Sequence, residues 1–165
     1  MIDLREYRNP DFDELWRIDH ECFQEGIAYS RRELAWYMKR SRAFTLVAEQ
    51  RTGKKILGFV VAESDPSGAG HILTIDVRPD GQRTGVGSLL LEAAERRLVL
   101  AKCKAVLLET AVSNTAALAF YKHHGYSVIE TIPRYYLNSI DALVMGKHLD
   151  ATGTAKAKRA KAKKT

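Results

Sequence analysis

Residues Gln82–Ser88 have the composition of a loop that binds phosphate groups. Two glycines, Gly85 and Gly87, lie between a buried strand predicted from His71 and a helix predicted over Ser88–Leu100. The first backbone N–H groups of a helix have no acceptor within it, and the helix dipole adds positive potential at that end. Because glycine has no side chain, a diphosphate can approach these amides closely. The stretch is therefore predicted to bind the pyrophosphate of a large carrier molecule.

Two common glycine-rich nucleotide motifs do not fit this loop. The dinucleotide motif Gly-x-Gly-x-x-Gly would need a third glycine where the chain has Leu90. The Walker motif needs Gly-Lys-Ser/Thr, which occurs nowhere in the sequence. What remains is the pattern Gln/Arg-x-x-Gly-x-Gly, carried by Gln82, Arg83, Thr84, Gly85, Val86 and Gly87.

Glu109 and Tyr121 are the residues best suited to move protons. Glu109 is a lone acid at the end of a predicted strand of Ala, Val and Leu, and apolar surroundings favour a carboxyl that takes up a proton, as a general base requires. A tyrosine hydroxyl, which ordinarily has a pKa of about 10, can donate a proton to a thiolate. Asn114 lies two helical turns before Tyr121, on the same face of a predicted helix. A solvent-facing Glu109, a core Tyr121 and a helix-capping Asn114 are the structural alternatives.

The other polar candidates are less specific. Asp76 is a rival base on the central strand, although a polar contact near the loop is the favoured alternative. The five histidines have no metal-ligand spacing, so no metal site is predicted: His20, His71, His123, His124 and His148. Cys22 and Cys103 form no redox or metal motif, and two isolated cysteines suit a reducing cytoplasm.

The elements that must position these residues alternate between strands and helices. Hydrophobic spacing and turn residues predict strands over residues 1–8, 44–48, 56–62, 71–79, 105–110, 126–132 and 140–149. Helices are predicted from Asn9 until Gly26, from a capping box at Ser30, over Ser88–Leu100 and over 114–124, with loops over 24–29, 65–70 and 133–139. This order predicts an α/β fold with a mixed sheet and helices on its faces.

Composition indicates one domain, residues 1–150, followed by a basic tail over 151–165. The chain has 165 residues, 45% of them hydrophobic, enough for a substantial core. The tail carries six of the 26 basic residues and no acidic one, so residues 1–150 hold 20 of each sign. The tail is predicted to be disordered, either as a solvated terminus or as a tether to RNA or the ribosome. No signal-peptide core or membrane-spanning apolar run is present, so no membrane contact is expected.

The loop pattern, together with a second segment, resembles the GNAT superfamily of acetyl-CoA-dependent N-acetyltransferases. The second segment runs from Leu108 to Asn114, continues over Ala117–Tyr121 and ends at Gly125-Tyr126. It is similar to Leu-Glu-Val-Arg-x-Ser-Asn, Ala-x-x-x-Tyr and Gly-Phe in RimI-type N-terminal acetyltransferases. The chain departs from that pattern at Ala111, where the family has Arg, and any contact of that Arg is then absent. The resemblance covers residues 1–149 and is sharpest over 71–126.

The resemblance implies the GNAT acyl-CoA N-acyltransferase fold, with acetyl-CoA as co-substrate, and a role for each candidate residue. The matching Glu109 would accept a proton from the amine, and Tyr121 would donate one to the CoA sulfur. The backbone N–H of Val77 would bind the developing oxyanion, and the helix–loop–helix near the N-terminus would form one wall of the acceptor groove. The coenzyme would contact Gln82, Arg83, Thr84, Gly85, Val86, Gly87, Ser88, Asn114 and Tyr121, and Tyr135 and Tyr136 would line the peptide groove.

The expected reaction is direct attack of an amine on acetyl-CoA in a ternary complex. The favoured acceptor is the α-amino group of a protein N-terminus, whose pKa of about 7.7–8.0 makes deprotonation manageable. A small amine or a lysine side chain is the alternative acceptor. A module that binds CoA or RNA without catalysis is the third possibility, and the retained Glu109 and Tyr121 argue against it.

Overall fold

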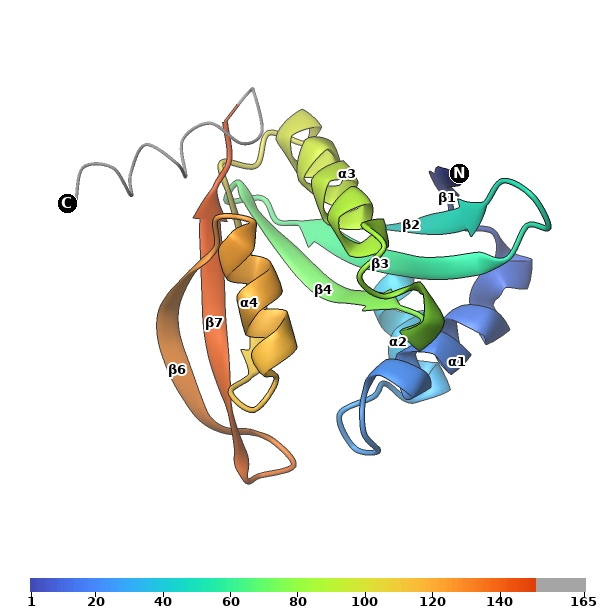
Figure 1. Cartoon of the computed structure of the whole chain (residues 1–165). Coiled ribbons are helices and arrows are strands. Elements are labelled where there is room, and N and C mark those ends of the chain that lie inside the picture. Colours follow the sequence, from blue (N-terminus) through green and yellow to red (C-terminus); the bar gives the residue numbers. More distant parts are fainter. Residues whose placement is uncertain (151–165) are drawn as a thin grey trace. The chain divides into compact units, whose positions relative to one another are not determined.

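The structure, a computed structural model, describes residues 1–150, and its elements follow the predicted order (Figure 1). The strands form a seven-stranded sheet in the order β1-β2-β3-β4-β5-β7-β6. Backbone contacts divide the chain into two units, which are described separately. Unit 1 contains residues 1–63 and 72–94, and unit 2, within the described residues, contains residues 64–71 and 95–150. The predicted disordered tail, residues 151–165, lies outside the described residues, and its proposed contact with RNA stays a prediction.

Unit 1 contains the N-terminal strands and helices and the larger part of β4. Its elements are β1 (Ile2–Glu6), the 3₁₀ turn η1 (Asn9–Asp11), α1 (Phe12–Cys22), α2 (Arg31–Met38), β2 (Ala43–Gln50), β3 (Ile56–Ser64) and the 3₁₀ turn η2 (Pro79–Gly81). Two elements pass through both units, β4 (Ala69–Val77) and α3 (Val86–Leu100). β1 pairs antiparallel with β2, and β2 pairs antiparallel with β3.

The core of unit 1 lies between α1, α2 and one face of β2 and β3. It consists of Leu15, Ile18, Leu34, Val47, Ile56, Phe59 and Val61, which are all buried. Gly58 points to the opposite face, where a Cβ atom would come within 3.3 Å of Leu90 Cδ1 on α3 and 2.5 Å of the Asp76 carbonyl oxygen. Because successive strand residues face opposite sides, α3 covers the face that α1 and α2 leave open. Only a glycine at position 58 allows this close approach of β4.

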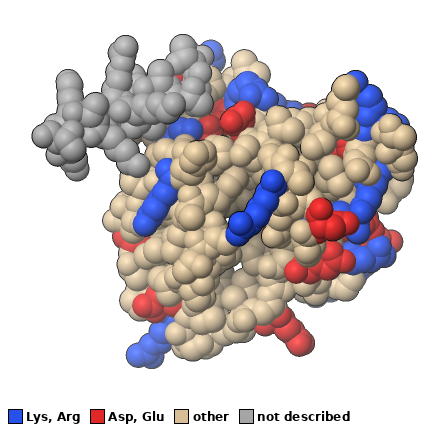
Figure 2. Space-filling model, in the orientation of Figure 1, with Lys and Arg blue, Asp and Glu red and all other residues tan. Residues whose placement is uncertain are grey.

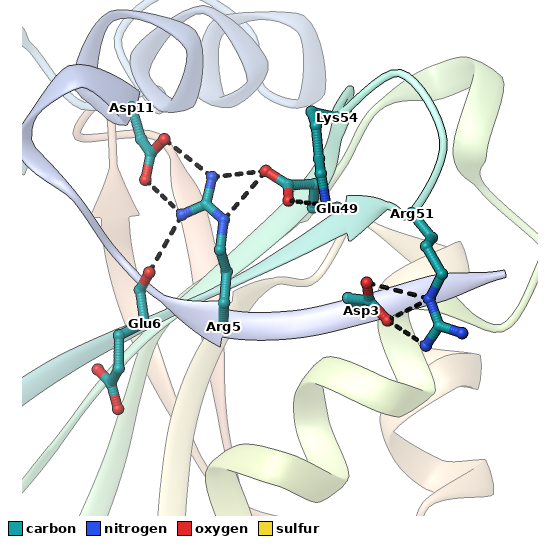
Figure 3. A network of polar contacts seen from close by, with 7 residues as sticks. All are labelled: Asp3, Arg5, Glu6, Asp11, Glu49, Arg51 and Lys54. Atoms are coloured by element: carbon teal, nitrogen blue, oxygen red, sulfur yellow. Dashed lines mark hydrogen bonds and ion pairs between the residues drawn. The ribbon is translucent and has the colours of Figure 1, made fainter.

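A half-buried guanidinium joins β1 to η1 and β2 (Figure 3). Arg5 donates to both oxygens of Asp11, at 2.8 and 3.0 Å, and to Glu49 Oε2 at 2.8 and 3.0 Å. Burial alone would raise the pKa of the Asp11 carboxyl, but the Arg5 guanidinium and the Arg8 backbone N–H hold it below its ordinary value. Hydrogen bonding to Arg5 likewise lowers the pKa of Glu49. The edge strand β1 is therefore held by charge as well as by its ladder.

Unit 2 contains the C-terminal strands and α4. Its elements are β5 (Ala105–Ala111), α4 (Thr115–His123), β6 (Ser127–Tyr136) and β7 (Ile140–His148). The first residues of β4 pair in parallel with β5, and His71 lies opposite Leu107. β7 pairs antiparallel with both β5 and β6. Gly125 ends α4 with a φ of 90°, the left-handed conformation predicted for it.

The predicted elements are confirmed in number and order, and the capping box is confirmed by a 3.1 Å hydrogen bond from Glu33 N to Ser30 Oγ. Several boundaries were wrong. α1 ends at Cys22, before Gly26, and β5, which was predicted to be covered on both faces, alternates between buried and half-buried residues. The connection over 65–70 is a turn in which Asp65 Oδ1 accepts from Ser67 N, and Ala69 already belongs to β4.

Two further corrections concern the candidate site. α3 begins at Val86, two residues before the predicted Ser88, because the buried Val86 side chain anchors its first turn. The predicted loop over 133–139 is mostly strand, since β6 extends to Tyr136. A register shift between Ile132 and Tyr136 accommodates the proline on this edge strand.

Charged side chains of both signs are interspersed on the face drawn in Figure 2, where most of the atoms belong to uncharged residues. This distribution agrees with the formal neutrality of residues 1–150. An excess positive charge is therefore a property of the tail sequence and not of this face.

Replacing Arg5 with Met should lower the free energy of unfolding at pH 7 by about 2 kcal/mol, because Asp11 and Glu49 would stay partly buried without a cationic partner. The two carboxyl groups have lowered pKa values in the folded state, so their contribution is present above their unfolded pKa values and is lost as the pH falls through the folded ones. Urea unfolding at pH 7 and at pH 3 should show that the difference between wild type and variant shrinks in acid.

The matched control is Arg51→Met, which removes an exposed guanidinium from its ion pair with Asp3. Exposed ion pairs contribute little, so the unfolding midpoint should stay close to that of the wild type. Equal effects of the two substitutions would show that burial of the Arg5 network does not stabilise the fold.

Candidate active site

The predicted phosphate-binding loop lies in unit 1 between β4 and α3. Its backbone turns at Arg83 and Gly85, which have φ angles of 61° and 89°. Leu89 N donates to Gly85 O at 3.1 Å, so the helical hydrogen bonding starts at Gly85. The amides of Val86 and Gly87 belong to the first helical turn, where backbone N–H groups have no acceptor within the helix. A Cβ atom built at Gly85 would meet no heavy atom within 4 Å, so the space above this turn can admit a ligand.

Two polar side chains of the loop brace it from within. Gln82 Nε2 donates to the Val77 carbonyl oxygen at 3.1 Å, and the Thr84 hydroxyl donates to the Gly81 carbonyl oxygen. Cys22 Sγ also donates to the Val77 carbonyl, at 3.1 Å. The structure thus brings Val77 and the loop residues 82–88 together at one end of β4. In this arrangement the backbone, rather than the Gln82 or Thr84 side chain, is available to an anion.

In unit 2 the Glu109 side chain contacts a histidine. His71 Nε2 lies 2.6 Å from Glu109 Oε2, with 35% and 24% of the two side chains exposed. A carboxylate can only accept, so the imidazole donates through Nε2 and keeps Nδ1 as an acceptor. Leu107 lies opposite His71 in the parallel β4–β5 ladder, and Glu109 is two residues further on the same face of β5. The sequence predicted aliphatic surroundings for Glu109. In the structure its carboxylate instead contacts the His71 imidazole.

The charge of Glu109 acts on the hydroxyl of Tyr136. Burial raises the pKa of its hydroxyl above the ordinary value, and Tyr135 and the charge of Glu109 raise it further. The Tyr135 and Tyr136 rings lie edge to face, with their centroids 4.8 Å apart, and half of Tyr135 is exposed. Of the two predicted substrate-binding tyrosines, Tyr136 is thus near enough to Glu109 for its hydroxyl to respond to that charge.

Asn114 is the N-cap of α4 and Tyr121 lies on this helix, and both have structural roles. Asn114 Oδ1 accepts from Ala117 N at 3.1 Å, the N-cap alternative considered for this residue. Tyr121 is 8% exposed and packs edge to face against Phe120 and Tyr126, with ring centroids 5.2 and 5.6 Å away. The helix therefore holds Tyr121 in a defined position between two aromatic rings.

A buried ion pair fixes the end of α4 to α3 and β7. Lys147 Nζ lies 3.0 Å from Glu95 Oε2, and Tyr126 Oη donates to Glu95 Oε1 at 2.9 Å. Both charged side chains are only 3% exposed. Burial and the Glu95 carboxylate raise the pKa of the Tyr126 hydroxyl well above its ordinary value. Because Tyr126 contacts Tyr121, this cluster helps to orient the candidate proton donor.

Asp76 makes its polar contact in the interior of unit 1. It is 1% exposed and accepts from Thr74 Oγ1 at 2.7 Å, and its carboxyl group faces that of Asp19. The predicted contact is therefore with α1 and β4 residues rather than with the loop. His71, in contrast, was not singled out by the sequence, because its significance depends on the register between β4 and β5.

Two further findings concern residues 1–150. In this part of the chain, no group of three or more His, Cys, Asp or Glu side chains is placed to hold a metal ion. Nor does any helix described there have both the length and the apolar character needed to cross a bilayer.

Residues 5–126 match the family model described as "Acetyltransferase (GNAT) family". The chain belongs to the GNAT acetyltransferase family. As a member of this family it is an N-acetyltransferase, and the mixed sheet flanked by four helices is the GNAT fold predicted from the sequence. The predicted membership thus rests on a match over most of the described chain.

Individual relatives agree with this assignment. The GNAT chain is 28% identical over 145 residues to an uncharacterised N-acetyltransferase of Methanocaldococcus jannaschii, a match that covers 87% of this chain and 90% of the relative. It is 33% identical over 95 residues to human N-alpha-acetyltransferase 30, covering 55% of this chain and 26% of that protein. The crystal structure of the Escherichia coli ribosomal-protein-S18-alanine N-acetyltransferase superposes with a TM-score of 0.79 at 24% identity, covering 93% and 97% of the two chains.

The capping role of Asn114 can be tested through protein stability, without a ligand. Asn114→Ala should lower the free energy of unfolding by about 1 kcal/mol, because the α4 N-terminus would lose its side-chain acceptor. Asn114→Ser should keep nearly wild-type stability, since serine caps about as well. Thermal unfolding of the two variants checks this, and equal losses for Ala and Ser would contradict the capping role.

Proposed function

We propose that this protein transfers the acetyl group of acetyl-CoA to the α-amino group of a protein N-terminus, as a RimI-like enzyme. The observation that carries the proposal is the 2.6 Å contact between His71 Nε2 and Glu109 Oε2 beside Tyr136. A histidine paired with a carboxylate can accept a proton from an ammonium group. The likeness to human N-alpha-acetyltransferase 30 supports an N-terminal acceptor. Cys22 and Cys103 are not joined in a disulfide, which fits the predicted cytoplasmic location.

Acetyl-CoA would be held through the start of α3. The amides of Val86 and Gly87, together with the open space above Gly85, suit the diphosphate of the coenzyme. Gln82 and Thr84 would act by holding the loop in shape, since their side chains bond to backbone carbonyls. The backbone N–H of Val77 is the proposed donor to the thioester oxygen as that oxygen gains negative charge.

The proposed chemistry needs one proton acceptor and one proton donor. The α-ammonium group gives a proton to the His71–Glu109 pair, and the neutral amine then attacks the thioester carbonyl. The new C–N bond forms as the C–S bond breaks, and the departing CoA sulfur takes a proton from Tyr121. The nitrogen loses its second proton as the amide forms, and this proton restores the Tyr121 hydroxyl. Because the α-amine has a pKa of about 7.7–8.0, the deprotonation costs little near neutral pH. Tyr135 and Tyr136 would contact the peptide that follows the reacting amine.

Glu109→Gln tests the proton acceptor. The amide can still contact His71 but cannot hold the proton, so kcat/KM for peptide acetylation should fall about 100-fold. Acetyl-CoA binding, measured by calorimetry, should persist because the coenzyme loop is untouched. The control is Glu130→Gln, the same change at an exposed position of β6, which should leave the rate unchanged. Wild-type rates in the Glu109 variant would remove this residue from the mechanism.

Acceptor class is tested by comparing free N-terminal peptides, peptides with blocked N-termini that contain lysine, and polyamines under equal conditions. Release of the CoA thiol should be fastest with free N-termini. Faster turnover with lysine or polyamine would favour the alternative acceptors, and no thiol release with any acceptor would indicate a non-catalytic module.

Gly85→Ala tests the coenzyme loop against a matched glycine. Alanine at a φ of 89° costs about 1–2 kcal/mol of backbone strain, and its methyl group would enter the space assigned to the diphosphate. Gly53, in the β2–β3 turn, also has a positive φ and open space around it, so Gly53→Ala should be strained to a similar extent. Only Gly85→Ala should weaken CoA binding in calorimetry. Equal CoA affinities in the two variants would contradict the proposed binding site.

A further inference from the structure

Two carboxyl groups that no part of the proposed chemistry uses meet in the interior of unit 1. Asp19 on α1 is fully buried, Asp76 on β4 is 1% exposed, and their side chains are within hydrogen-bonding contact of each other. Burial of an isolated ionised carboxylate is strongly unfavourable unless it is paired. Two of them in contact therefore require an explanation.

In both Asp19 and Asp76, one carboxyl oxygen accepts a hydrogen bond and the other has no hydrogen-bond donor among the described residues. Asp19 Oδ2 accepts from Tyr29 N at 2.7 Å, and Asp76 Oδ1 accepts from Thr74 Oγ1 at 2.7 Å. The other two oxygens, Asp19 Oδ1 and Asp76 Oδ2, are buried without an N–H or O–H donor among the described residues. One proton placed between the two carboxyl groups would satisfy both oxygens and leave a single negative charge.

We propose that Asp19 and Asp76 share one proton, and that the resulting hydrogen bond is a positioning device that fixes the segment between α1 and α2 to the last residues of β4. Asp19 holds this segment through the Tyr29 backbone N–H, and Asp76 directly precedes Val77. The inference rests on the proposed function, in which Val77 faces the thioester. It makes Asp19 and Asp76 positioning residues rather than catalytic ones.

Further contacts converge on the same end of β4. Tyr29 Oη donates to Leu73 O at 3.2 Å, Cys22 Sγ donates to Val77 O at 3.1 Å, and Arg78 Nη1 lies 2.6 Å from Glu14 Oε1. These contacts also join α1 and the segment after it to β4. The carboxyl pair differs from them because its hydrogen bond exists only while the proton is bound.

The pKa directions agree with this geometry. Burial, followed by the charge of Asp19 and the contact with it, raises the pKa of Asp76 well above its ordinary value, and burial also raises that of Asp19. The other titratable groups that act on the pair are His20 on α1 and Glu33 on α2, and the pair in turn acts on Cys22 on α1. Since the raised pKa favours the protonated form in the folded state, the stabilisation is fully present below the unfolded pKa of Asp76 and is lost as the pH rises through the folded one.

The decisive comparison is between Asp19→Asn, Asp19→Leu and the control Glu21→Gln, an exposed carboxylate-to-amide change on the same helix. Infrared spectra at pH 6 should show the C=O band of a protonated carboxylic acid in the wild type and in Glu21→Gln. Asp19→Asn should lack this band, because the amide N–H replaces the shared proton and Asp76 becomes ionised. Absence of the band from the wild type, or its persistence in Asp19→Asn, would overturn the proposal.

Kinetics test whether the Asp19–Asp76 pair positions the segment between α1 and α2, which would form one wall of the acceptor groove. Above the pH at which the wild-type band disappears, the wild-type KM for peptide should rise, while Asp19→Asn should show no such rise. Asp19→Leu should raise the peptide KM about tenfold with kcat and the KM of acetyl-CoA near wild type, because the Tyr29 N–H loses its acceptor. Parallel pH profiles for wild type and Asp19→Asn would contradict a positioning role.

Two measurements keep this test separate from the proposed function. The infrared band can be recorded without any acetyl acceptor. The second measurement is the hydrogen-exchange rate of the Tyr29 amide, which reports directly whether Asp19 holds the segment after α1. This rate is compared between wild type and Asp19→Asn below and above the pH at which the band disappears. Faster exchange in the wild type alone above the transition is the expected result, and equal exchange would overturn the proposal. If the wild type and the variants gave the expected band and exchange patterns but the wild type acetylated no peptide, the proposed function would fail and the shared proton would stand.

Discussion

The parallel pairing of β4 with β5 is the constraint on which the candidate active site depends. This pairing sets His71 opposite Leu107, and the alternation of side chains then brings Glu109 onto the same face as the imidazole. A shift of one residue would turn one of the two side chains to the other face. Parallel neighbours also need a long crossover, and α3 provides it. The helix whose first turn is suited to an anion is thus the helix that the strand pairing requires.

Charged side chains inside the two units are neutralised by different groups. In unit 1, Arg5 is matched by the carboxylates of Asp11 and Glu49, and the exposed Lys54 lies 3.7 Å from the second oxygen of Glu49, so two cations balance two carboxylates. In unit 2, Glu95 is matched by Lys147, and a tyrosine hydroxyl completes the hydrogen bonding of the carboxylate. Among residues 1–150, neither Asp19 nor Asp76 forms an ion pair with a lysine or arginine, and the proposed shared proton balances part of their charge. Each arrangement joins a helical segment to a strand.

The residues of the candidate site also serve the fold. Asn114 caps α4, Tyr121 packs between Phe120 and Tyr126, and Gln82 and Thr84 bond to backbone carbonyls of their own loop. A structural role does not compete with a chemical one, because a group must be held in place before it can transfer a proton or bind a phosphate. This double use explains why single residues of the site could be interpreted in two ways from sequence, and why both interpretations could be right.

The sequence by itself determined the order of the elements, the family resemblance and the glycine-rich start of α3. Local signals carry this information: the capping box at Ser30, the left-handed Gly125 and the apolar spacing of the strands. The extension of β6 to Tyr136 escaped prediction because a register shift, set by pairing with β7, accommodates its proline. His71 as the partner of Glu109, and Asp19 as the partner of Asp76, were decided only by the tertiary structure. Each pair joins residues 38 or more positions apart, and no local pattern specifies which distant side chains share a face or an interior contact.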